Sequence, residues 1–386
     1  MSMTNAVTLA SSLPYASGAE VSKRTLIQIV PALPPATNGV GDYALTLAQA
    51  MRQDFGVDTV FVVGNDRWQG PDNVDGFRVA KLPAKSAGDL EAVLASIQMT
   101  SGSSSVLLQL SIYGYAPRGC PLWLLEGLKR WKSKQPDSRL VTMFHELYAS
   151  GRPWRSAFWL SFLQQRICAQ IARLSDTAVT NTHMHRERLE RLDPSKLQRM
   201  QVLATPSSVG EPLVFENVRS RNMVIFGLRP LRKQTYESKI GALQQACQRF
   251  GITEIHDVGS IFDGIPDHVG NIPVTKHGFM DAADLSSLLS SSLAGFLDYS
   301  AESLGKSSVF AAYCAHGLVP IVPVTHDHGA SEADGITCGV HYYNVAGNDG
   351  TEMMPNIQSI ADAAWTWYQG HSLRNHARAF ADLILS

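Results

Sequence analysis

The chain has 386 residues, which is too long for one ordinary hydrophobic core and predicts two domains of roughly 200 residues or fewer. Apolar residues make up 45% of the chain and charged residues 17%, so extensive disorder is excluded outside the ends. The formal net charge of −1 gives no broad basic field, and we therefore expect no nucleic-acid partner.

Residues 1–22 are small and polar, and we expect them to form a flexible leader. They lack the basic start and the continuous apolar core of a secretion signal, and no segment has the 18 or so consecutive apolar residues of a membrane span. The five cysteines are widely spaced and form no CxxC pair. This pattern is typical of reduced thiols and predicts a cytoplasmic protein.

Residues 23–205 alternate short apolar runs with helical patterns, as in α/β domains with a parallel sheet. We expect strands at Thr25–Val30, Val57–Val63, Val106–Leu110, Leu140–Phe144 and Thr177–Thr180. Helices are expected between them, at Tyr43–Arg52, Leu90–Ile97, Leu122–Trp131, Ala157–Arg173 and His185–Leu192. Residues 206–220 are rich in Pro, Ser and Gly and are interpreted as an interdomain linker.

A second alternation covers residues 221–370. The expected strands are Met223–Phe226, Ile255–Val258, Val274–His277, Ala294–Leu297 and Val319–Val324. The expected helices are Glu237–Phe250, Ala282–Ser290, Ser307–His316, Ile357–Trp367 and, in the last segment 371–386, Leu373–Leu385. The fold class is therefore α/β, with two Rossmann-like, doubly wound domains facing a cleft, and that cleft is the expected ligand site.

A glycine loop, PPATNGVGDY, follows the first expected strand and precedes a helix. Gly39 and Gly41 would let the backbone approach a ligand, and the helix start offers unpaired N–H groups to an anion. The loop does not have the spacing GxGxxG, so a dinucleotide fold is not indicated. A plain strand-to-helix turn remains the alternative.

A second loop, in GFLDYSAESLGKSSVFAAYCAHG, is one glycine short of the phosphate-loop pattern GxxxxGK[ST], because Ser300 occupies the first glycine position. A nucleoside-triphosphatase reading is disfavoured, since only about 80 residues follow Lys306 and the next strand is followed by Thr325 rather than Asp. The same residues could still hold a phosphate at a helix N-terminus, because Gly305 permits the turn and Lys306, Ser307 and Ser308 bring a cation, hydroxyls and amides. A solvent-exposed lysine in the first turn of a helix remains the alternative.

Four segments in order resemble the GT-B-fold glycosyltransferases of the retaining, nucleotide-sugar-dependent class, and in particular glycosyltransferase family 4. They are PPATNGVGDYALTLAQAM, TMFHELYASG, VIFGLRPLRK and VTKHGFMDAADLSSLLSSSLAGFLDYS. The resemblance implies an acceptor-side domain at 23–205, a donor domain at 221–370, and a last helix, 371–386, that crosses back to the first domain. It also implies a metal-independent enzyme without a cofactor, and the sequence has no DxD triplet.

The resemblance also implies roles for individual residues. Catalytic roles fall to His145, Arg229 and Lys233, with Arg232 as a competing cation, and donor binding falls to Gly39, Gly41, Glu302, Gly305, Lys306, Ser307 and Ser308. The sequence departs from the family pattern in one respect. Many members carry a second glutamate eight positions after the first, and that position is Phe310 here, or Ala312 in the other register.

Two further segments suggest where an acceptor would bind. Tyr113, Tyr115 and Arg118 follow a strand and are candidates for stacking on a saccharide, with core packing as the alternative. The segment GRPWRSAFWLSFLQQRICAQIAR combines Trp154, Trp159 and Phe162 with Arg152, Arg155 and Arg166. It would suit peripheral contact with the inner membrane face and a lipid-linked acceptor, with an ordinary packed helix as the alternative.

Together these patterns predict a sugar transferase that acts in polysaccharide or cell-envelope glycan synthesis. The missing glutamate favours one alternative, a catalytically silent protein that binds a nucleotide sugar or glycan. A sugar-nucleotide epimerase or hydrolase on the same frame is another. The pairs His183/His185 and His326/His328 have strand-like metal-ligand spacing but no clear third ligand, so no metal is expected.

Overall fold

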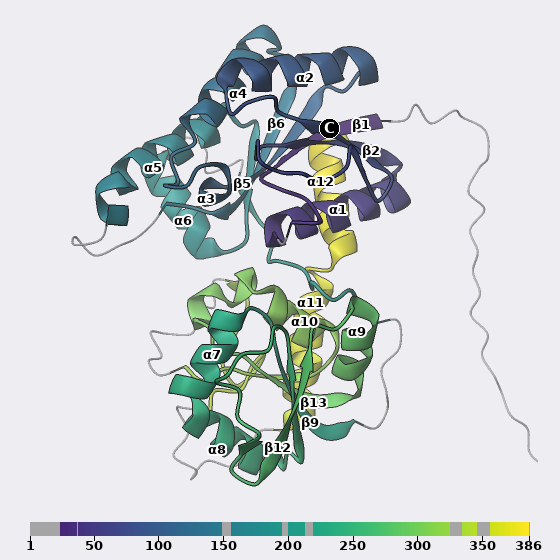
Figure 1. Ribbon diagram of the computed structural model, residues 1–386, viewed down its shortest axis with the longest axis vertical. Helices are drawn as coiled ribbons and strands as arrows, with labels where there is room; N and C mark the ends of the chain where they lie inside the picture. The colour runs from purple at the N-terminus through teal and green to yellow at the C-terminus, as the bar shows by residue number, and fades with distance from the viewer. Residues whose placement is uncertain are drawn as a thin grey trace, which may run out of the picture.

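The computed structural model describes residues 24–36, 38–148, 156–194, 200–212, 219–324, 334–345 and 356–385. The expected flexible leader, 1–22, lies outside them. Figure 1 shows two domains stacked along the long axis of the molecule. The chain is α/β, with a parallel sheet at the centre of each domain, as the sequence predicts.

The N-terminal domain is built on an eight-stranded sheet in the order β3-β4-β2-β1-β5-β6-β7-β8, parallel except for the β3–β4 pair. Its central strands are buried along their length, because helices cover both faces. The strands are β1 Arg24–Val30, β2 Val57–Val63, β3 Asn73–Val74, β4 Phe77–Lys81, β5 Ser105–Ser111, β6 Arg139–Glu146, β7 Thr177–Thr180 and β8 Met200–Val202. The helices are α1 Gly39–Phe55, α2 Ala87–Ser101, α3 Ile112–Tyr115, α4 Leu122–Lys134, α5 Ser156–Leu174 and α6 His183–Leu192.

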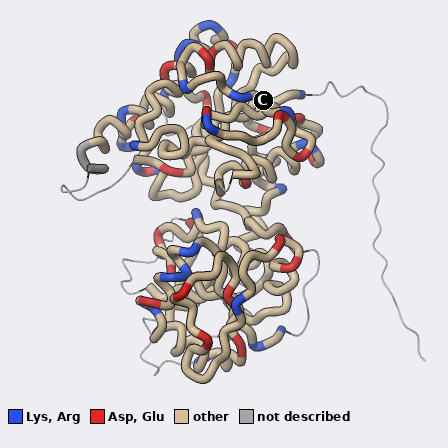
Figure 2. Tube along the Cα trace, viewed as in Figure 1, with Lys and Arg blue, Asp and Glu red and all other residues tan. Residues whose placement is uncertain are grey.

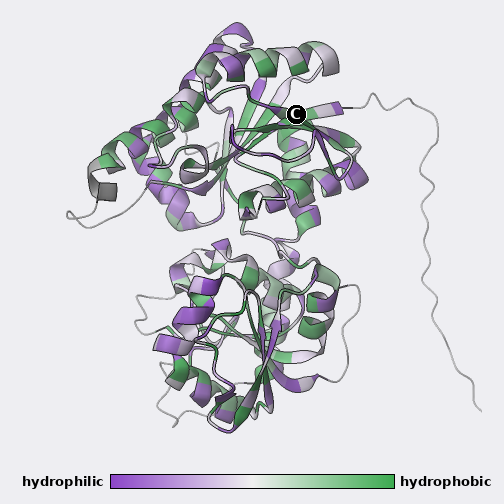
Figure 3. Ribbon diagram, in the orientation of Figure 1, coloured by the Kyte–Doolittle hydropathy of each residue, from purple (hydrophilic) through white to green (hydrophobic). Residues whose placement is uncertain are grey.

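The C-terminal domain repeats this plan with a six-stranded sheet in the order β11-β12-β10-β9-β13-β14, in which only the β11–β12 pair is antiparallel. Its strands are β9 Ser220–Phe226, β10 Glu254–Val258, β11 His268–Val269, β12 Ile272–Gly278, β13 Ser292–Phe296 and β14 Val319–Ile321. Its helices are α7 Arg229–Ser238, α8 Ile240–Phe250, α9 Ala282–Ser291, the 3-10 helix η2 Ala301–Lys306, α10 Ser308–Ala315 and α11 Ile357–Gln369. The central strands of the N-terminal domain are mainly hydrophobic (Figure 3), whereas β10 of the C-terminal domain also carries Glu254, His256 and Asp257.

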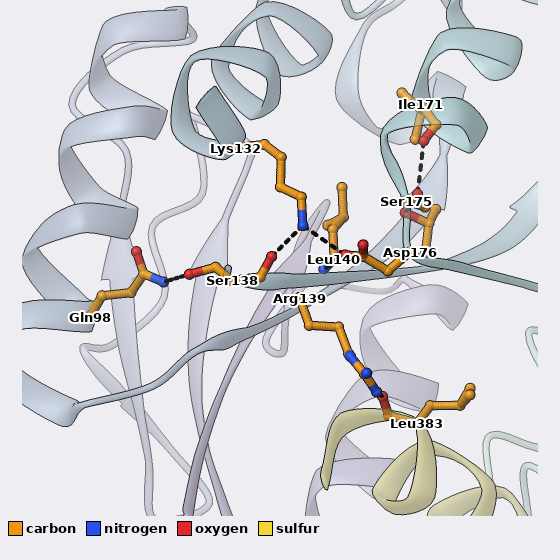
Figure 4. A network of polar contacts seen from close by, with 10 residues as sticks. Gln98, Lys132, Ser138, Arg139, Leu140, Ile171, Ser175, Asp176 and Leu383 are labelled. Carbon is orange, nitrogen blue, oxygen red and sulfur yellow. Dashed lines mark hydrogen bonds and ion pairs between the residues drawn. The ribbon is translucent and has the colours of Figure 1, made fainter. Parts of the chain in front are cut away.

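The last helix, α12 Leu373–Leu385, lies against the N-terminal domain (Figure 1). Phe380, with Ala377 and Ala381, packs in a core cluster that includes residues of β1, α1, β5 and β6. At its C-terminal end the guanidinium of Arg139 donates to the carbonyl of Leu383 at 2.6 Å (Figure 4). The N-terminal core therefore includes the final segment of the chain.

The element predictions need several corrections. The predicted helix Glu237–Phe250 is divided at Lys239 into α7 and α8, and α7 begins eight residues earlier, at Arg229. The residues that α7 buries are Arg232, Thr235 and Tyr236, so its inward face shows no apolar periodicity in the sequence. The predictions also lack the strands β3, β4, β8 and β11 and the short helices α3 and η2, and β14 ends at Ile321 rather than Val324.

Candidate functional site

A cavity of about 760 Å³ lies between the two domains. It opens at the carboxyl ends of both sheets, where β1 lies between β2 and β5 and where β9 lies between β10 and β13. Such crossover points are where parallel α/β sheets bind ligands, because the loops diverge there. The polar or charged lining residues include Asn38, Asp42, Tyr43, Thr46, Ser111, His145, Glu146, Asn181, Thr205, Ser207, Ser208, Tyr299, Lys306, Ser307 and Ser308.

His145 and Lys306 line this cavity from opposite domains, although 161 positions separate them in the sequence. His145 is the penultimate residue of β6, and Lys306 ends η2. Burial, and after it the charges of Lys306 and His376, lower the pKa of His145 to about 3. The imidazole is therefore neutral near pH 7, and a cation faces it across the cleft.

The start of α10 brings two more predicted residues to the cavity. Ser307 is the N-cap of this helix, and its hydroxyl accepts from the N–H of Phe310 at 3.1 Å. Ser308 is the first helical residue, and both serines line the cavity. The helix N-terminus therefore contributes positive partial charge beside Lys306.

Gly305 and Glu302 do not line the cavity in the described part of the chain. The carbonyl of Gly305 accepts from the N–H of Thr205 at 2.7 Å, so this glycine contacts the last residue of the segment assigned to the N-terminal domain. Glu302 is exposed in the first turn of η2. Since residues 301–306 form a 3-10 helix, they do not form an open phosphate loop of the nucleoside-triphosphatase kind.

The two glycines of the N-terminal loop have different surroundings. Gly39 is exposed and lines the cavity, with open space where a side chain would begin. Gly41 is buried, and its N–H donates to the side chain of Asn38 at 2.9 Å, so this amide is not free for an anion. A Cβ at Gly41 would overlap the carbonyl oxygen of Ala32, so the close backbone approach at this position is to the chain itself.

Substituting Gly41 by alanine should therefore destabilise the protein. Overpacking of this kind typically lowers the free energy of unfolding by about 1–3 kcal/mol. The matched control is Gly39→Ala, which has nothing within 4 Å of the new methyl group. Urea unfolding followed by circular dichroism measures both variants. Equal midpoints for the two would contradict the assigned contact.

The structure does not bring Arg229 and Lys233 into the cavity. Arg229 is exposed, and its guanidinium carbon lies 5.5 Å from the centre of the Phe262 ring. Lys233 pairs with Glu237 at 3.4 Å on the surface of α7. Both residues lie on helix α7, and neither is among the residues that line the cavity.

Arg232, the competing cation, does not line the cavity either. Its side chain is 1% exposed and forms a two-pronged ion pair with Asp257, which also accepts from the hydroxyl of Tyr236 at 2.9 Å. A further N–H donates to the carbonyl of Ser260 at 3.1 Å. Among the lining residues that the structure describes, Lys306 is therefore the one lysine or arginine.

The predicted acceptor residues separate into one core residue and two surface residues. Tyr115 is fully buried, and its hydroxyl donates to the carbonyls of Ile29 and Gln109, so its proposed contact with an acceptor is corrected to core packing. Tyr113 is 42% exposed and accepts from Gln164 at 3.1 Å, and Arg118 is exposed. Neither residue is among those that line the cavity.

Several lining residues were not predicted. Glu146 accepts from the hydroxyl of Ser111 at 2.7 Å, and burial followed by the charge of Glu146 raises the pKa of Tyr299 in the other domain. Desolvation raises the pKa of Asp42. In the sequence, Asp42 follows Gly41 and Glu146 follows His145, and both of these neighbours were predicted site residues. The position after an expected strand is the signal that could have identified Asp42 and Glu146 as well.

One wall of the cavity is apolar. Phe279 follows β12 and is 86% exposed, and Met280, Leu285 and Val258 line the cavity beside it. An aromatic ring this exposed presents a face on which a planar ring can stack. The C-terminal half of the cleft therefore combines an apolar wall with a cationic corner.

The histidine pairs do not form a metal centre in the described residues. His183 contacts Asp334 through its backbone N–H at 2.7 Å and its ring at 2.8 Å, which joins α6 to the other domain. His185 is buried, and the pair His326/His328 lies outside the described residues. In the ranges that the structure covers, no group of three or more His, Cys, Asp or Glu is placed to hold a metal ion.

Among the described residues, no helix is both long and apolar enough to cross a membrane.

No model of a known protein family matches the sequence, and no curated protein matches it significantly. Solved structures with a similar fold include three that show the range of activities. A glycosyltransferase from Rickettsia africae aligns with a TM-score of 0.60 at 12% identity, over 94% of this chain and 98% of that one. The lipopolysaccharide outer core galactosyltransferase WaaB gives 0.56 at 11% identity, over 94% and 99%.

The third is the UDP-GlcNAc 2-epimerase of Neisseria meningitidis bound to UDP-GlcNAc, with a TM-score of 0.52 at 8% identity, over 94% and 99% of the two chains. These similarities show that the chain has the GT-B fold of two Rossmann-like domains. The predicted fold is confirmed.

Proposed function

We propose that this chain is a metal-independent glycosyltransferase that moves a sugar from a nucleoside-diphosphate sugar to a saccharide or a lipid-linked acceptor. Its setting would be polysaccharide or cell-envelope glycan synthesis in the cytoplasm. The observation that carries the proposal is the pairing, across one cavity, of Lys306 and the start of α10 with His145 of the other domain. The GT-B fold of the similar structures supports the same class.

The leaving nucleoside diphosphate gains negative charge as the glycosidic bond breaks. Lys306 and the N-terminal amides of α10 are fixed donors beside the place where this charge would develop. They would do the work that a divalent metal does in other transferases. Retention of configuration follows only from the family resemblance, and NMR analysis of the product anomer tests it.

The other polar groups of the cavity suit a sugar. Asp42 and Glu146 are carboxylates that accept hydrogen bonds from hydroxyl groups, and neutral His145 lies next to Glu146. With a pKa of about 3, His145 is too weak a base to take a proton from a hydroxyl group near pH 7. Its proposed role is a hydrogen bond to the transferred sugar.

Substituting His145 by alanine is expected to leave the protein folded and to abolish measurable transfer, because the sugar loses a hydrogen-bonding partner at the reacting end of the cleft. Product formation and far-ultraviolet circular dichroism measure the two properties. His268→Ala, in the exposed edge strand β11, is the matched control and should retain full activity. Full transfer by the His145 variant would remove this residue from the proposed site.

The donor can be found with a thermal-shift panel of UDP-, GDP-, ADP- and dTDP-sugars without metal, alongside ATP with magnesium. A ligand present at about a hundred times its dissociation constant adds roughly 2.7 kcal/mol to the free energy of unfolding. Stabilisation by one nucleotide sugar is the expected result. Stabilisation by ATP with magnesium alone would contradict the proposed function.

A second candidate is a sugar-nucleotide epimerase or hydrolase, which the similarity to the UDP-GlcNAc 2-epimerase favours. Incubation with the donor identified above, without an acceptor, separates the candidates. A changed or hydrolysed sugar nucleotide indicates the second candidate, and turnover only with an acceptor indicates transfer. Binding with no turnover across acceptors indicates a silent binding protein.

Peripheral membrane contact is part of the proposal for a lipid-linked acceptor. On α5, Phe162 is 63% exposed, and the guanidinium of Arg166 lies 4.6 Å from the centre of its ring. The side chains of Arg152, Trp154, Arg155 and Trp159 lie outside the described residues. Elsewhere Lys and Arg alternate with Asp and Glu along both domains (Figure 2), which supports a partner other than nucleic acid. Flotation with anionic vesicles tests the membrane contact.

A further inference from the structure

A chain of buried amides reaches the ring of His145 from the interior of the N-terminal domain. The Nε2 atom of His145 lies 2.6 Å from Oε1 of Gln109 on β5. The amide nitrogen of Gln109 donates to Oε1 of Gln28 on β1 at 2.6 Å, and the amide nitrogen of Gln28 donates to the carbonyl of Ala44 at 3.4 Å. Both glutamines are fully buried, so water does not compete for these groups.

The backbone carbonyl of Ala44, the last acceptor in this series of hydrogen bonds, fixes the direction of each hydrogen bond in the series. The carbonyl of Ala44 can only accept, so Gln28 must turn its NH₂ group toward it and its oxygen toward Gln109. Gln109 must then turn its own oxygen toward His145. That oxygen can only accept, so Nε2 of His145 carries the proton.

A second, partly buried side chain also contacts the ring of His145. Tyr43 on α1 packs edge to face against His145, with ring centres 5.2 Å apart. Nε2 of His376 on α12 lies 2.7 Å from the carbonyl of Ala204, so Nε2 carries the proton and Nδ1 accepts from the hydroxyl of Tyr43 at 3.0 Å. The last helix thus holds Tyr43 in place, and Tyr43 limits the rotation of the His145 ring.

We infer that Gln28 and Gln109 are positioning residues that hold His145 as the Nε2–H tautomer, with Nδ1 presented to the cavity as a hydrogen-bond acceptor. No described residue hydrogen-bonds to Nδ1. A neutral hydrogen-bond acceptor at this position suits a ligand group that donates a hydrogen bond, such as a hydroxyl group of a sugar. It does not suit a carboxylate or a phosphate, which accept hydrogen bonds. The identity of the ligand rests on the proposed function, whereas the tautomer does not.

The tautomer can be measured on the full-length protein without any ligand. Long-range ¹H–¹⁵N correlation spectra of histidine-labelled protein distinguish Nδ1–H, Nε2–H and the doubly protonated ring. For His145, assigned by its loss in His145→Ala, we expect the Nε2–H form alone near pH 7. The Nδ1–H form or an imidazolium at that pH would overturn the inference.

Variants test the part played by Gln109. In Gln109→Leu the Nε2 proton loses its acceptor, so we expect a mixture of tautomers and a loss of turnover larger than any change in donor affinity. Gln98→Leu is the matched control, because this amide bonds Ser138 and Trp131 and does not contact His145. A pure Nε2–H form with unchanged kinetics in Gln109→Leu would refute the role of Gln109.

A second variant covers the case in which Gln109→Leu does not fold. Gln109→Glu places a carboxylate beside the ring, which favours the imidazolium and should raise the pKa of His145 by about 1–3 units. The charges of Lys306 and His376 act on the ring and Tyr43 packs against it, and these groups remain unchanged, as do Glu146 and Asp42 in the same cavity. Because only the neutral ring presents an acceptor, the acid side of the pH–activity profile should move upward by a similar amount. An unshifted His145 titration would contradict the contact, whereas a shifted titration without any transferase activity would count only against the proposed function.

Discussion

Replacing Lys306 by alanine is expected to slow transfer by about ten- to a hundredfold. Charged hydrogen bonds contribute roughly 1.5–3 kcal/mol each, and 1.36 kcal/mol corresponds to a factor of ten in rate. Lys306 is the one lysine or arginine among the described residues that line the cavity, so no neighbouring cation there replaces it. The turnover rate with the donor identified by thermal shift is the quantity to measure.

The controls for this prediction are Lys233→Ala and Arg229→Ala, which remove cations of the same domain that lie outside the cavity. Both should transfer at nearly the wild-type rate. Removing Lys306 should also raise the pKa of His145, because the positive charge of Lys306 opposes protonation of the ring. If the Lys233 or Arg229 variant lost as much activity as the Lys306 variant, the assignment of Lys306 as the cation that binds the diphosphate would be wrong.

Replacing Arg232 by alanine is expected to lower the free energy of unfolding by about 3–5 kcal/mol. Removing one partner of a buried ion pair leaves the other charge without compensation, and Asp257 is as buried as Arg232. The substitution also deprives the Ser260 carbonyl of its donor. Urea unfolding followed by circular dichroism measures the change.

A surface pair provides the comparison. Arg191 and Glu187 lie one turn apart on α6 and are both largely exposed. Arg191→Ala should leave the urea midpoint nearly unchanged, because water already solvates both charges. A small effect of Arg232→Ala, close to that of Arg191→Ala, would show that Asp257 is stabilised without the arginine.

The order of the strands along the chain was largely predictable. The strand β2 and the helix α12 were predicted with their observed bounds, because continuous apolar runs and an apolar face are visible in the sequence. Most of helix α7 was not predicted, because it buries Arg232 and Tyr236 against Asp257, a partner more than 20 positions away. Hydrophobic periodicity does not detect a helix whose inward face is polar.

The candidate site was only partly predictable, for a related reason. His145, Lys306, Ser307, Ser308 and Gly39 were predicted at strand ends or helix starts, and the structure places them around one cavity. Tyr115 has the same kind of position in the sequence, but its side chain turns into the core. A loop position shows that a residue lies near the edge of a sheet, but the direction of its side chain depends on what packs around it.

The sequence by itself therefore determined two parallel α/β domains and the edges at which a ligand would bind, since these depend on local apolar runs and on the residues that end them. The tertiary structure alone decided which charges face the cavity. Lys306 lines it, while Arg232 is held inside the C-terminal domain by its buried ion pair with Asp257. It also decided the protonation of His145, because that depends on Gln28 and Gln109 from two other strands and on the carbonyl of Ala44. Such long-range contacts are set by packing and leave no pattern in the sequence.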